Sequence, residues 1–271
     1  MRESGIYKDV DIEIYHSEEG ISSSGISLIL DCPKRYNFEY MQGKKERDGN
    51  AFKLGSAFHM MMLEPEKFDK TYYAMTSEVD LRTKVGKEEF FKAEHEAKGR
   101  TILRKKEYDE VYAMALEASA HSVWESIELD KGFAEYSIYW DAGLYNTRLR
   151  SRPDFFNESI IIDLKTTDSI ASFSKSVYNY GYHRQAAMQI DGLQKIDGIK
   201  RFFAFFVIEK KAPYLTACFT LEEEAIALGR KEYLEGAAIY SECLKFDNWP
   251  GYEEQFQLIK LPSWKKGEEN A

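Results

Sequence analysis

Residues 152–167 read RPDFFNESIIIDLKTT, and this stretch decides which fold the chain is expected to adopt. Ile160 to Lys165 is rich in β-branched residues and follows a turn at Phe156-Asn157-Glu158, a pattern typical of a strand. Side chains two positions apart on a strand share a face, so Asp163 and Lys165 point together while their neighbours point into the core. The turn brings Asp154 back beside them.

These residue types predict a metal site. Two converging carboxylates near a backbone carbonyl form a pocket of hard oxygen ligands suited to Mg²⁺, and a nearby ammonium can orient an attacking water. The pattern of an acid, any residue and a lysine is weak by itself, because Glu96-Ala97-Lys98 and Glu209-Lys210-Lys211 also match it. Asp163 and Lys165 differ because they end an apolar run and pair with an upstream Asp. The alternative is a surface salt bridge at a strand end.

The periodicity of the flanking sequence predicts an α/β (α+β) fold on one mixed sheet with flanking helices. The expected helices cover Ser22 to about Tyr40 with an interruption near Pro33, Ala51 to Leu63, Glu88 to Ala97, Glu107 to Ile127, Ser169 to about Gln194, and Leu221 to Leu244. Phe133 to Trp140, Leu144 to Arg152 and Ile160 to Lys165 are expected to form an antiparallel three-strand meander, with further strands at Arg201 to Glu209 and Tyr214 to Thr220.

The composition indicates one globular domain. The 271 residues are 44% hydrophobic and 14% aromatic, and no linker or repeat divides them. We expect a single domain over 1–271, with a helical N-terminal part at about 20–128, an αβββαβ core at about 105–220, and a C-terminal helix and tail at 221–271. No apolar run approaches the roughly 20 residues that span a bilayer, so we expect a cytoplasmic protein with no membrane partner.

Charge and cysteine content restrict the possible functions further. The net charge of −9 argues mildly against nucleic-acid binding, although an acidic protein can still line one groove with basic side chains. Cys32, Cys218 and Cys243 lie far apart, which disfavours a disulfide framework, a zinc site or an iron–sulfur cluster. We expect them to be buried thiols.

Two further groups of residues extend the pattern. The segment from Gly55 to His59 puts a histidine on a predicted helix, and Tyr178, Tyr182, Gln185 and Gln189 have the spacing of one helix face. Taken singly, a lone histidine is more often structural, and a tyrosine stripe more often serves packing.

Together these motifs resemble a known family. Gly55 with His59, Arg152-Pro153-Asp154, Asp163-Leu164-Lys165-Thr166 and the helical Gln185 resemble the RecB-like subgroup of PD-(D/E)xK nucleases. A narrower similarity, to the nuclease domain of RecE-type exonucleases of phage or prophage origin, covers roughly residues 20 to 265. It rests on residues near the start, in the helical segment around Gln185 and near the end of the chain: Ile21, Ser22, Ser24, Tyr182, His183, Gln185, Ala187, Asp191, Gly192, Trp249, Tyr252, Pro262 and Trp264.

The resemblance implies a restriction-endonuclease-like core with N-terminal helical additions, and a role for each site residue. It implies that Asp154, Asp163, the Leu164 backbone carbonyl and His59 bind Mg²⁺, for which Mn²⁺ can substitute. Lys165 would orient the attacking water and stabilise developing charge, and Gln185 would position Lys165 or the DNA backbone. The subgroup usually has Tyr where this chain has Gln189, a departure that weakens the second half of the helix motif.

Other site assignments remain open at the level of sequence. Glu135 is a candidate second-metal ligand or an ordinary strand carboxylate. Arg148, Arg150 and Arg152 alternate along a predicted strand, and they would contact phosphate or form a solvated face paired with acids. Thr166 and Tyr182 are further candidates for DNA contacts.

The resemblance also implies an activity and partners. The expected enzyme hydrolyses phosphodiester bonds from double-stranded DNA ends, 5′ to 3′, and leaves 3′ overhangs for a single-strand annealing recombinase in DNA recombination. A ring-shaped homo-oligomer is expected. The alternatives are another RecB-like nuclease, for which the cluster cysteines are absent, and a catalytically silent DNA-end-binding or structural subunit.

Overall fold

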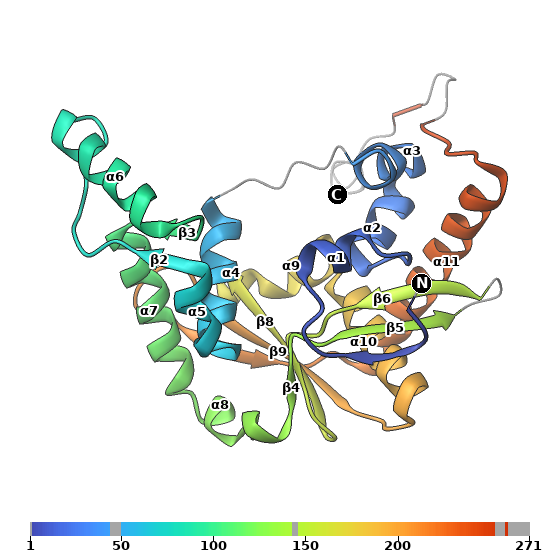
Figure 1. Ribbon diagram of the computed structural model, residues 1–271. Coiled ribbons are helices and arrows are strands. Elements are labelled where there is room, and N and C mark those ends of the chain that lie inside the picture. The colour runs from blue at the N-terminus through green and yellow to red at the C-terminus, as the bar shows by residue number, and fades with distance from the viewer. Residues whose placement is uncertain (1, 44–49, 143–145, 253–257, 260–271) are drawn as a thin grey trace, which may run out of the picture.

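The computed structural model describes residues 2–43, 50–142, 146–252 and 258–259 (Figure 1). Ser22, whose hydroxyl accepts from the Gly25 N–H, caps the second helix, and Pro33 begins the third. The N-terminal and central helices are α1 (Ile12–Ser17), α2 (Ser23–Asp31), α3 (Pro33–Tyr36), the π-helical turn Asn37–Met41, α4 (Asn50–Leu63), α5 (Pro65–Thr71), α6 (Lys84–Ala97), α7 (Lys105–Ser119) and α8 (Ser122–Ser126). The later ones are α9 (Phe173–Asn179), α10 (Tyr182–Asp197) and α11 (Glu223–Phe246), with 3₁₀ turns at Leu129–Lys131 and Ile170–Ser172.

The strands form three sheets. The central mixed sheet has the order β10 (Thr216–Phe219), β9 (Phe202–Glu209), β8 (Ile160–Thr167), β7 (Phe155–Phe156) and β4 (Phe133–Ala134). Only β8 and β9 are parallel in it. A second sheet has the order β1 (Gly5–Tyr7), β5 (Ser137–Ala142) and β6 (Thr147–Ser151), and a third pairs β2 (Tyr72–Ala74) with β3 (Thr101–Leu103).

Helices cover both faces of the central sheet, so the predicted α/β class is confirmed (Figure 1). On one face, alternate strand residues such as Ile161, Phe203 and Phe205 pack in one core cluster with residues of α2, α10 and α11. On the other face Ile162, Leu164 and others pack with α4 and α7. This alternation is the period of two that an extended strand imposes.

The predicted three-strand meander is wrong in its pairing. β6 pairs only with β5 in its sheet, whereas β8 pairs with the short β7 and with β9. The cause lies in two interruptions: Glu135 has a φ of 56°, which L-residues rarely adopt, and Pro153 cannot donate a ladder hydrogen bond. Together they bend one long hairpin into a β5–β6 half and a β4–β7 half.

The helix predicted from Ser169 to Gln194 is also interrupted. A 3₁₀ turn, α9 and α10 replace it. The helical conformation is interrupted at Gly181, whose φ is 69°. L-residues rarely adopt this φ, so a side chain at this position would strain the backbone, and its Cβ would also displace the Arg184 guanidinium. Tyr178 therefore belongs to α9 and does not share a helix with Tyr182 and Gln185.

Several features complete the comparison with the expectations. Nothing in the sequence predicted β1, α1, β2 or β3. Cys32 and Cys243 are buried free thiols as expected, while Cys218 is half-buried. No helix in the described part of the chain is long and apolar enough to cross a membrane. Gly143, Leu144, Pro262 and Trp264 lie outside the described residues.

Candidate active site

Three carboxylates come together where the hairpin bends. Ala134 faces Phe155 in the β4–β7 pair, so the next pair is Glu135 and Asp154, whose backbones share a hydrogen bond of 3.0 Å. Phe155 faces Ile162 in the β7–β8 pair, so the same register continues to Asp154 and Asp163. The topology thus aligns Glu135, Asp154 and Asp163 across three neighbouring chain segments.

The Asp154 side chain binds β8 where no described strand pairs with that edge of it. The strand β7 covers β8 only at Ile161 and Ile162, and beyond it the Leu164 N–H donates to Asp154 Oδ2 at 2.6 Å. The N–H and C=O of one strand residue point to the same side, so the Leu164 carbonyl also faces Asp154. The family resemblance assigns this carbonyl as a metal ligand, and its direction toward Asp154 is compatible with that role.

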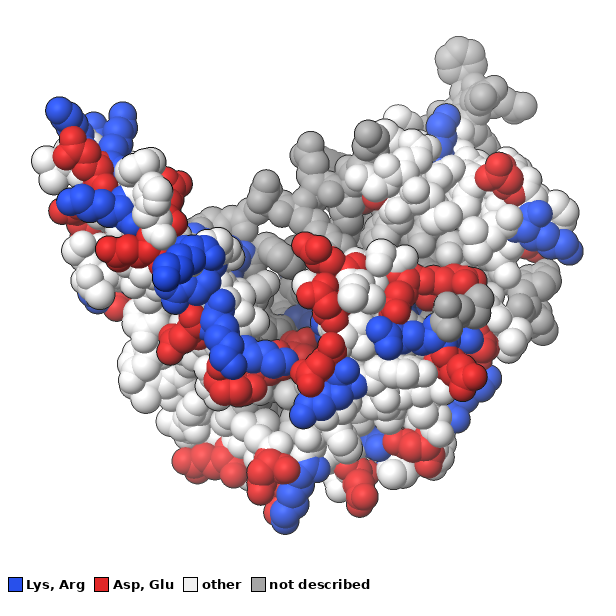
Figure 2. Space-filling model, in the orientation of Figure 1, with Lys and Arg blue, Asp and Glu red and all other residues white. Residues whose placement is uncertain are grey.

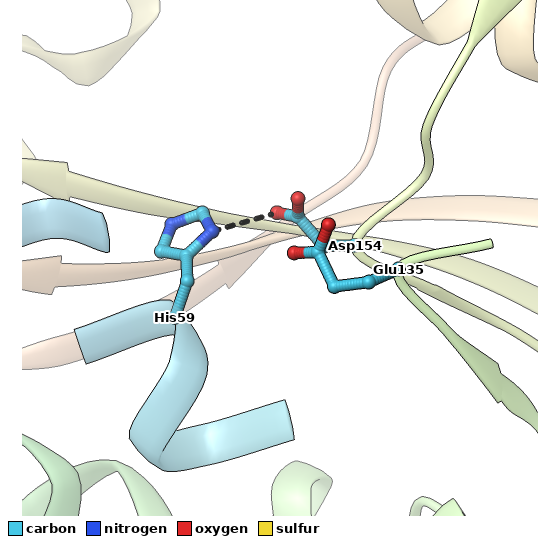
Figure 3. A group of neighbouring side chains, drawn as sticks. All are labelled: His59, Glu135 and Asp154. Atoms are coloured by element: carbon cyan, nitrogen blue, oxygen red, sulfur yellow. Dashed lines mark ion pairs between the residues drawn. The ribbon is translucent and has the colours of Figure 1, made fainter. Parts of the chain in front are cut away.

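His59 reaches the same carboxylate from α4. Its Nδ1 lies 3.5 Å from Asp154 Oδ2, and Figure 3 shows the imidazole facing Asp154 and Glu135. One potential ligand atom from each of these three residues lies within 4.8 Å of the others. The sequence leaves Glu135 as either a second-metal ligand or an ordinary strand carboxylate. Its position beside His59 and Asp154 is the one that a metal ligand would take.

Asp163 lies on the α10 side of β8 with Lys165. It is fully buried, its Oδ2 accepts from the Lys165 ammonium, and its Oδ1 accepts from Gln185 Nε2 at 2.6 Å. The Lys165 ammonium also lies 4.7 Å from the centroid of the Tyr182 ring, in the position of a cation–π contact. Two donors thus occupy Asp163, which belongs to no three-residue metal cluster among the described residues.

Burial and mutual repulsion set the protonation of the cluster. Burial and the charge of Asp154 raise the pKa of Glu135 to about 8. Burial also raises the pKa of Asp163, to about 6, against the opposing effect of Lys165. For Asp154, burial is outweighed by His59, Lys165 and the Leu164 N–H, and its pKa is lowered. Burial therefore opposes the simultaneous ionisation of all three carboxylates, most strongly for Glu135.

This donor set fits a divalent cation. Carboxylate oxygens and a backbone carbonyl are hard ligands that suit Mg²⁺ and Mn²⁺, and an imidazole nitrogen can complete the set. Burial, the main cause, and the charge of Asp154 disfavour an ionised Glu135. A cation held by His59, Glu135 and Asp154 would offset both effects and favour the carboxylate.

A cavity of about 760 Å³ opens beside this cluster. Glu135 and His59 line it on one side, and residues of the N-terminal segment and α5 line it on the other. Acidic and basic side chains are interspersed over the face around it, with no uniformly basic stripe among the residues coloured there (Figure 2).

The three arginines of β6 and its end have different environments. Arg150 is buried, donates to the carbonyls of Tyr15, His16 and Glu18, and is unavailable to a phosphate, so that candidate role is wrong for it. Arg148 Nε lies 2.8 Å from Asp141 Oδ1, within a face that the N-terminal segment covers and that is not solvated. Only Arg152 lines the cavity.

Two other predicted residues take structural positions. Thr166 points to the α4 side of β8, where a Cβ at Gly55 would lie 3.8 Å from its hydroxyl, and this position neither supports nor excludes a DNA contact. Gln189 is completely buried, and neither of its amide atoms has a hydrogen-bond partner within the described ranges. No local pattern marks the cavity residues Lys8, Val10 and Lys67 as neighbours of the site, so they were not predicted.

Comparison with known proteins gives the family. Residues 22–262 match the family model described as a PDDEXK-like domain of unknown function (DUF3799). The chain belongs to this family. The match supports the resemblance to the PD-(D/E)xK nuclease superfamily and spans every element of the site except the N-terminal wall of the cavity. No curated protein matches the chain.

Solved structures agree with the fold of the family. A "putative exonuclease" from Eubacterium rectale shares 15% sequence identity with a TM-score of 0.65, covering 97% of this chain and 100% of that one. At this identity the likeness establishes the fold, and the restriction-endonuclease-like core predicted from the motifs is confirmed. The protein SSO0001 shares 13% identity over 80% of this chain and 76% of its own, with a TM-score of 0.37, and carries no argument.

Proposed function

We propose that this protein is a Mg²⁺-dependent exodeoxyribonuclease that hydrolyses phosphodiester bonds at the ends of linear double-stranded DNA. The observation that carries the proposal is the alignment of Glu135, Asp154 and Asp163 with Lys165 beside them. Carboxylates that converge beside a buried ammonium are costly to bury, so such an arrangement favours a chemical role.

Each residue has a role that its geometry supports. His59, Glu135 and Asp154 face one point where a cation can bind, and the Leu164 carbonyl lies on the Asp154 side of β8. Asp163 can also bind the cation if it gives up its hydrogen bond from Gln185 or Lys165. A bound Mg²⁺ supplies a Lewis acid that neutralises charge as the 3′ oxygen leaves. The Lys165 ammonium donates hydrogen bonds, so it can orient the attacking water and stabilise developing charge on the phosphate. Gln185 and Tyr182 hold Asp163 and Lys165 in place.

The finer parts of the proposal rest on the RecE-type resemblance. Cleavage from 5′ to 3′, 3′ overhangs, an annealing recombinase as partner and a ring-shaped homo-oligomer follow from the motifs shared with those exonucleases. A silent DNA-end-binding subunit is the rival of a different class. Lys165 argues against it, since a binder needs no water-orienting ammonium that touches a buried carboxylate.

A digestion assay tests the proposal. Linear duplexes labelled at the 5′ or the 3′ end and a covalently closed circle of the same sequence are incubated with Mg²⁺ or with EDTA. We expect Mg²⁺-dependent loss of the linear duplex, early release of the 5′ label and an intact circle. Absence of cleavage under all metal conditions would favour the silent subunit, and a nicked circle would indicate an endonuclease.

A further inference from the structure

The cavity beside the metal cluster has a wall that lies outside the part of the chain matched by the family model. Lys8, Val10 and His16 line it together with Glu135 and His59, and all three N-terminal residues precede residue 22, where the family match begins. The strand β1 and the isolated bridge of Ile21 to Leu149 hold the N-terminal segment against the hairpin. This wall is therefore fixed next to the reacting groups.

Arg152 presents a fixed positive charge to this cavity. Its Nε and Nη2 donate to Ser137 Oγ at 3.0 and 2.7 Å, and Nη2 also donates to the Val10 carbonyl at 2.6 Å. Its guanidinium lies over the Tyr15 ring, 4.7 Å from the centroid. Every one of these partners is neutral, and no carboxylate within the described residues forms an ion pair with Arg152. A guanidinium held in this way retains its attraction for an anion.

Lys8 adds a second cation to the same wall. Its side chain is exposed, it lines the cavity, and it has no ion-pair partner in the part of the chain that the structure describes. The acids of the cavity are largely engaged elsewhere. Lys67 binds Glu64 at 2.5 Å and Asp9 at 3.2 Å, Glu135 faces the metal cluster, and Glu66 remains as an acid exposed to solvent.

The position of Arg152 relates it to the bond that is cut. It lies two residues before Asp154, a span of about 6.6 Å in an extended chain. An anion bound by Arg152 thus lies beside the group held at Asp154, and it is separate from that group.

We propose that Arg152 and Lys8 bind a backbone phosphate of the cleaved strand, next to the phosphodiester that is hydrolysed. This inference rests on the proposed nuclease function and adds to it a substrate-positioning site that joins Arg152 to Lys8, a residue outside the matched family region. The N-terminal segment acts through two contacts: Lys8 touches the phosphate, and the Val10 carbonyl orients Arg152.

Salt-dependent DNA binding tests the proposal. The Kd for a short labelled duplex is measured at several salt concentrations, with Ca²⁺ in place of Mg²⁺ to suspend cleavage. Lys8→Ala and Arg152→Gln are compared with Lys8→Arg and with Lys200→Ala. The control residue Lys200 is exposed and precedes β9, at the end of the parallel strands away from Lys165.

We expect Lys8→Ala and Arg152→Gln to weaken binding by about fivefold to tenfold and to reduce the salt slope by about 0.9, the value for one phosphate contact. Lys8→Arg should retain wild-type affinity, and Lys200→Ala should change neither quantity. Because Lys8 is exposed, its variant decides the outcome even if Arg152→Gln is unstable.

A single methylphosphonate, scanned through the strand near its end, locates the contact. At one position the neutral group should weaken binding to wild type by about fivefold to tenfold and leave Lys8→Ala unaffected, because that variant has already lost the contact. If wild type cleaves DNA while Lys8→Ala and Arg152→Gln bind as wild type does, the phosphate site is wrong and the nuclease stands. If wild type neither cleaves nor binds DNA, both proposals fail.

Discussion

The β5–β6 half and the β4–β7 half of the bent hairpin are formed by the same two chain segments, but their side chains have different roles. In the β5–β6 half, Arg148 lies against Asp141 and Arg150 donates to three carbonyls of the N-terminal segment. At the bend, Arg152 and Glu135 line an open cavity and Asp154 stands beside them. One alternating row of arginines therefore includes residues that hold the fold and one that faces the candidate site.

The difference comes from what covers each half. The segment around α1 lies over Arg150 and excludes solvent from it, whereas beside Arg152 the same segment forms only one wall of a cavity. Strand alternation assigns side chains to a face, but the element packed on that face decides whether they serve stability or chemistry.

The largest expected effect lies at the bend. Asp154→Asn and Asp163→Asn should each lower Mg²⁺-dependent cleavage by roughly 10³ or more, because each removes an anion that supports the metal with little change in volume. Single-turnover rates on linear duplex measure the loss, and thermal unfolding verifies the fold. Asp168→Asn, at an exposed carboxylate just after β8, is the matched control and should cleave normally. Near-normal turnover in either site variant would refute the assignment.

In the other half, the expected effect is on stability. Arg150→Met should lower the free energy of unfolding by about 3 kcal/mol, because the carbonyls of Tyr15, His16 and Glu18 lose their charged donor. At saturating DNA, the cleavage rate of the folded fraction should stay close to wild type. Denaturant unfolding and single-turnover kinetics give the two values. A large loss of cleavage rate without a loss of stability would contradict the structural role assigned to Arg150 and would place it, like Arg152, at the candidate site.

A smaller effect is expected at His59. Replacing it with Ala removes one metal ligand among several, so half-maximal activity should need about tenfold more Mg²⁺, with a shift of preference toward Mn²⁺. Metal titrations of the cleavage rate measure both changes, and His95→Ala, an exposed helical histidine, serves as the control. An unchanged titration would assign His59 a structural role.

The smallest effect concerns the stability of the cluster without metal. The folded-state pKa of Glu135, about 8, lies above the ordinary value of 4.5, so its ionisation destabilises the fold increasingly as pH rises from about 4.5 to 8. In EDTA at pH 8, Glu135→Gln should therefore raise Tm by roughly 2–4 °C, or about 1 kcal/mol. At pH 4 the two proteins should unfold together, and the variant should gain less stability from Mg²⁺ than wild type does. Equal melting at pH 8, or an undiminished Mg²⁺ effect, would contradict a strained carboxylate that binds metal.

Local pattern predicted the parts of the site that lie within one element. The period of two placed Asp163 and Lys165 on one face of β8, and the ion pair between them agrees with that placement. The role of Gln185 beside them came from the family resemblance, and in the structure its amide contacts Asp163. The placement of Asp163 and Lys165 needed only the geometry of a single strand.

The parts that failed depend on contacts distant in sequence. β1 pairs with β5 more than a hundred residues later, and nothing in residues 5–7 specifies that partner. Arg150 looked like a surface residue because the segment that buries it lies at the start of the chain. The break of the predicted helix at Gly181 depends on a positive φ, which the apolar period does not report.

The most direct test of the catalytic account is Lys165→Ala, measured on one preparation for cleavage and for metal binding. Lys165 touches Asp163 and cannot ligate Mg²⁺, so the single-turnover rate on 5′-labelled duplex should fall by roughly 10² or more while calorimetry shows metal binding largely unchanged. The control Lys200→Ala should match wild type in both. A variant that keeps its rate would show that Lys165 is not the catalytic lysine, and one that loses the metal as well would contradict the proposed division of roles.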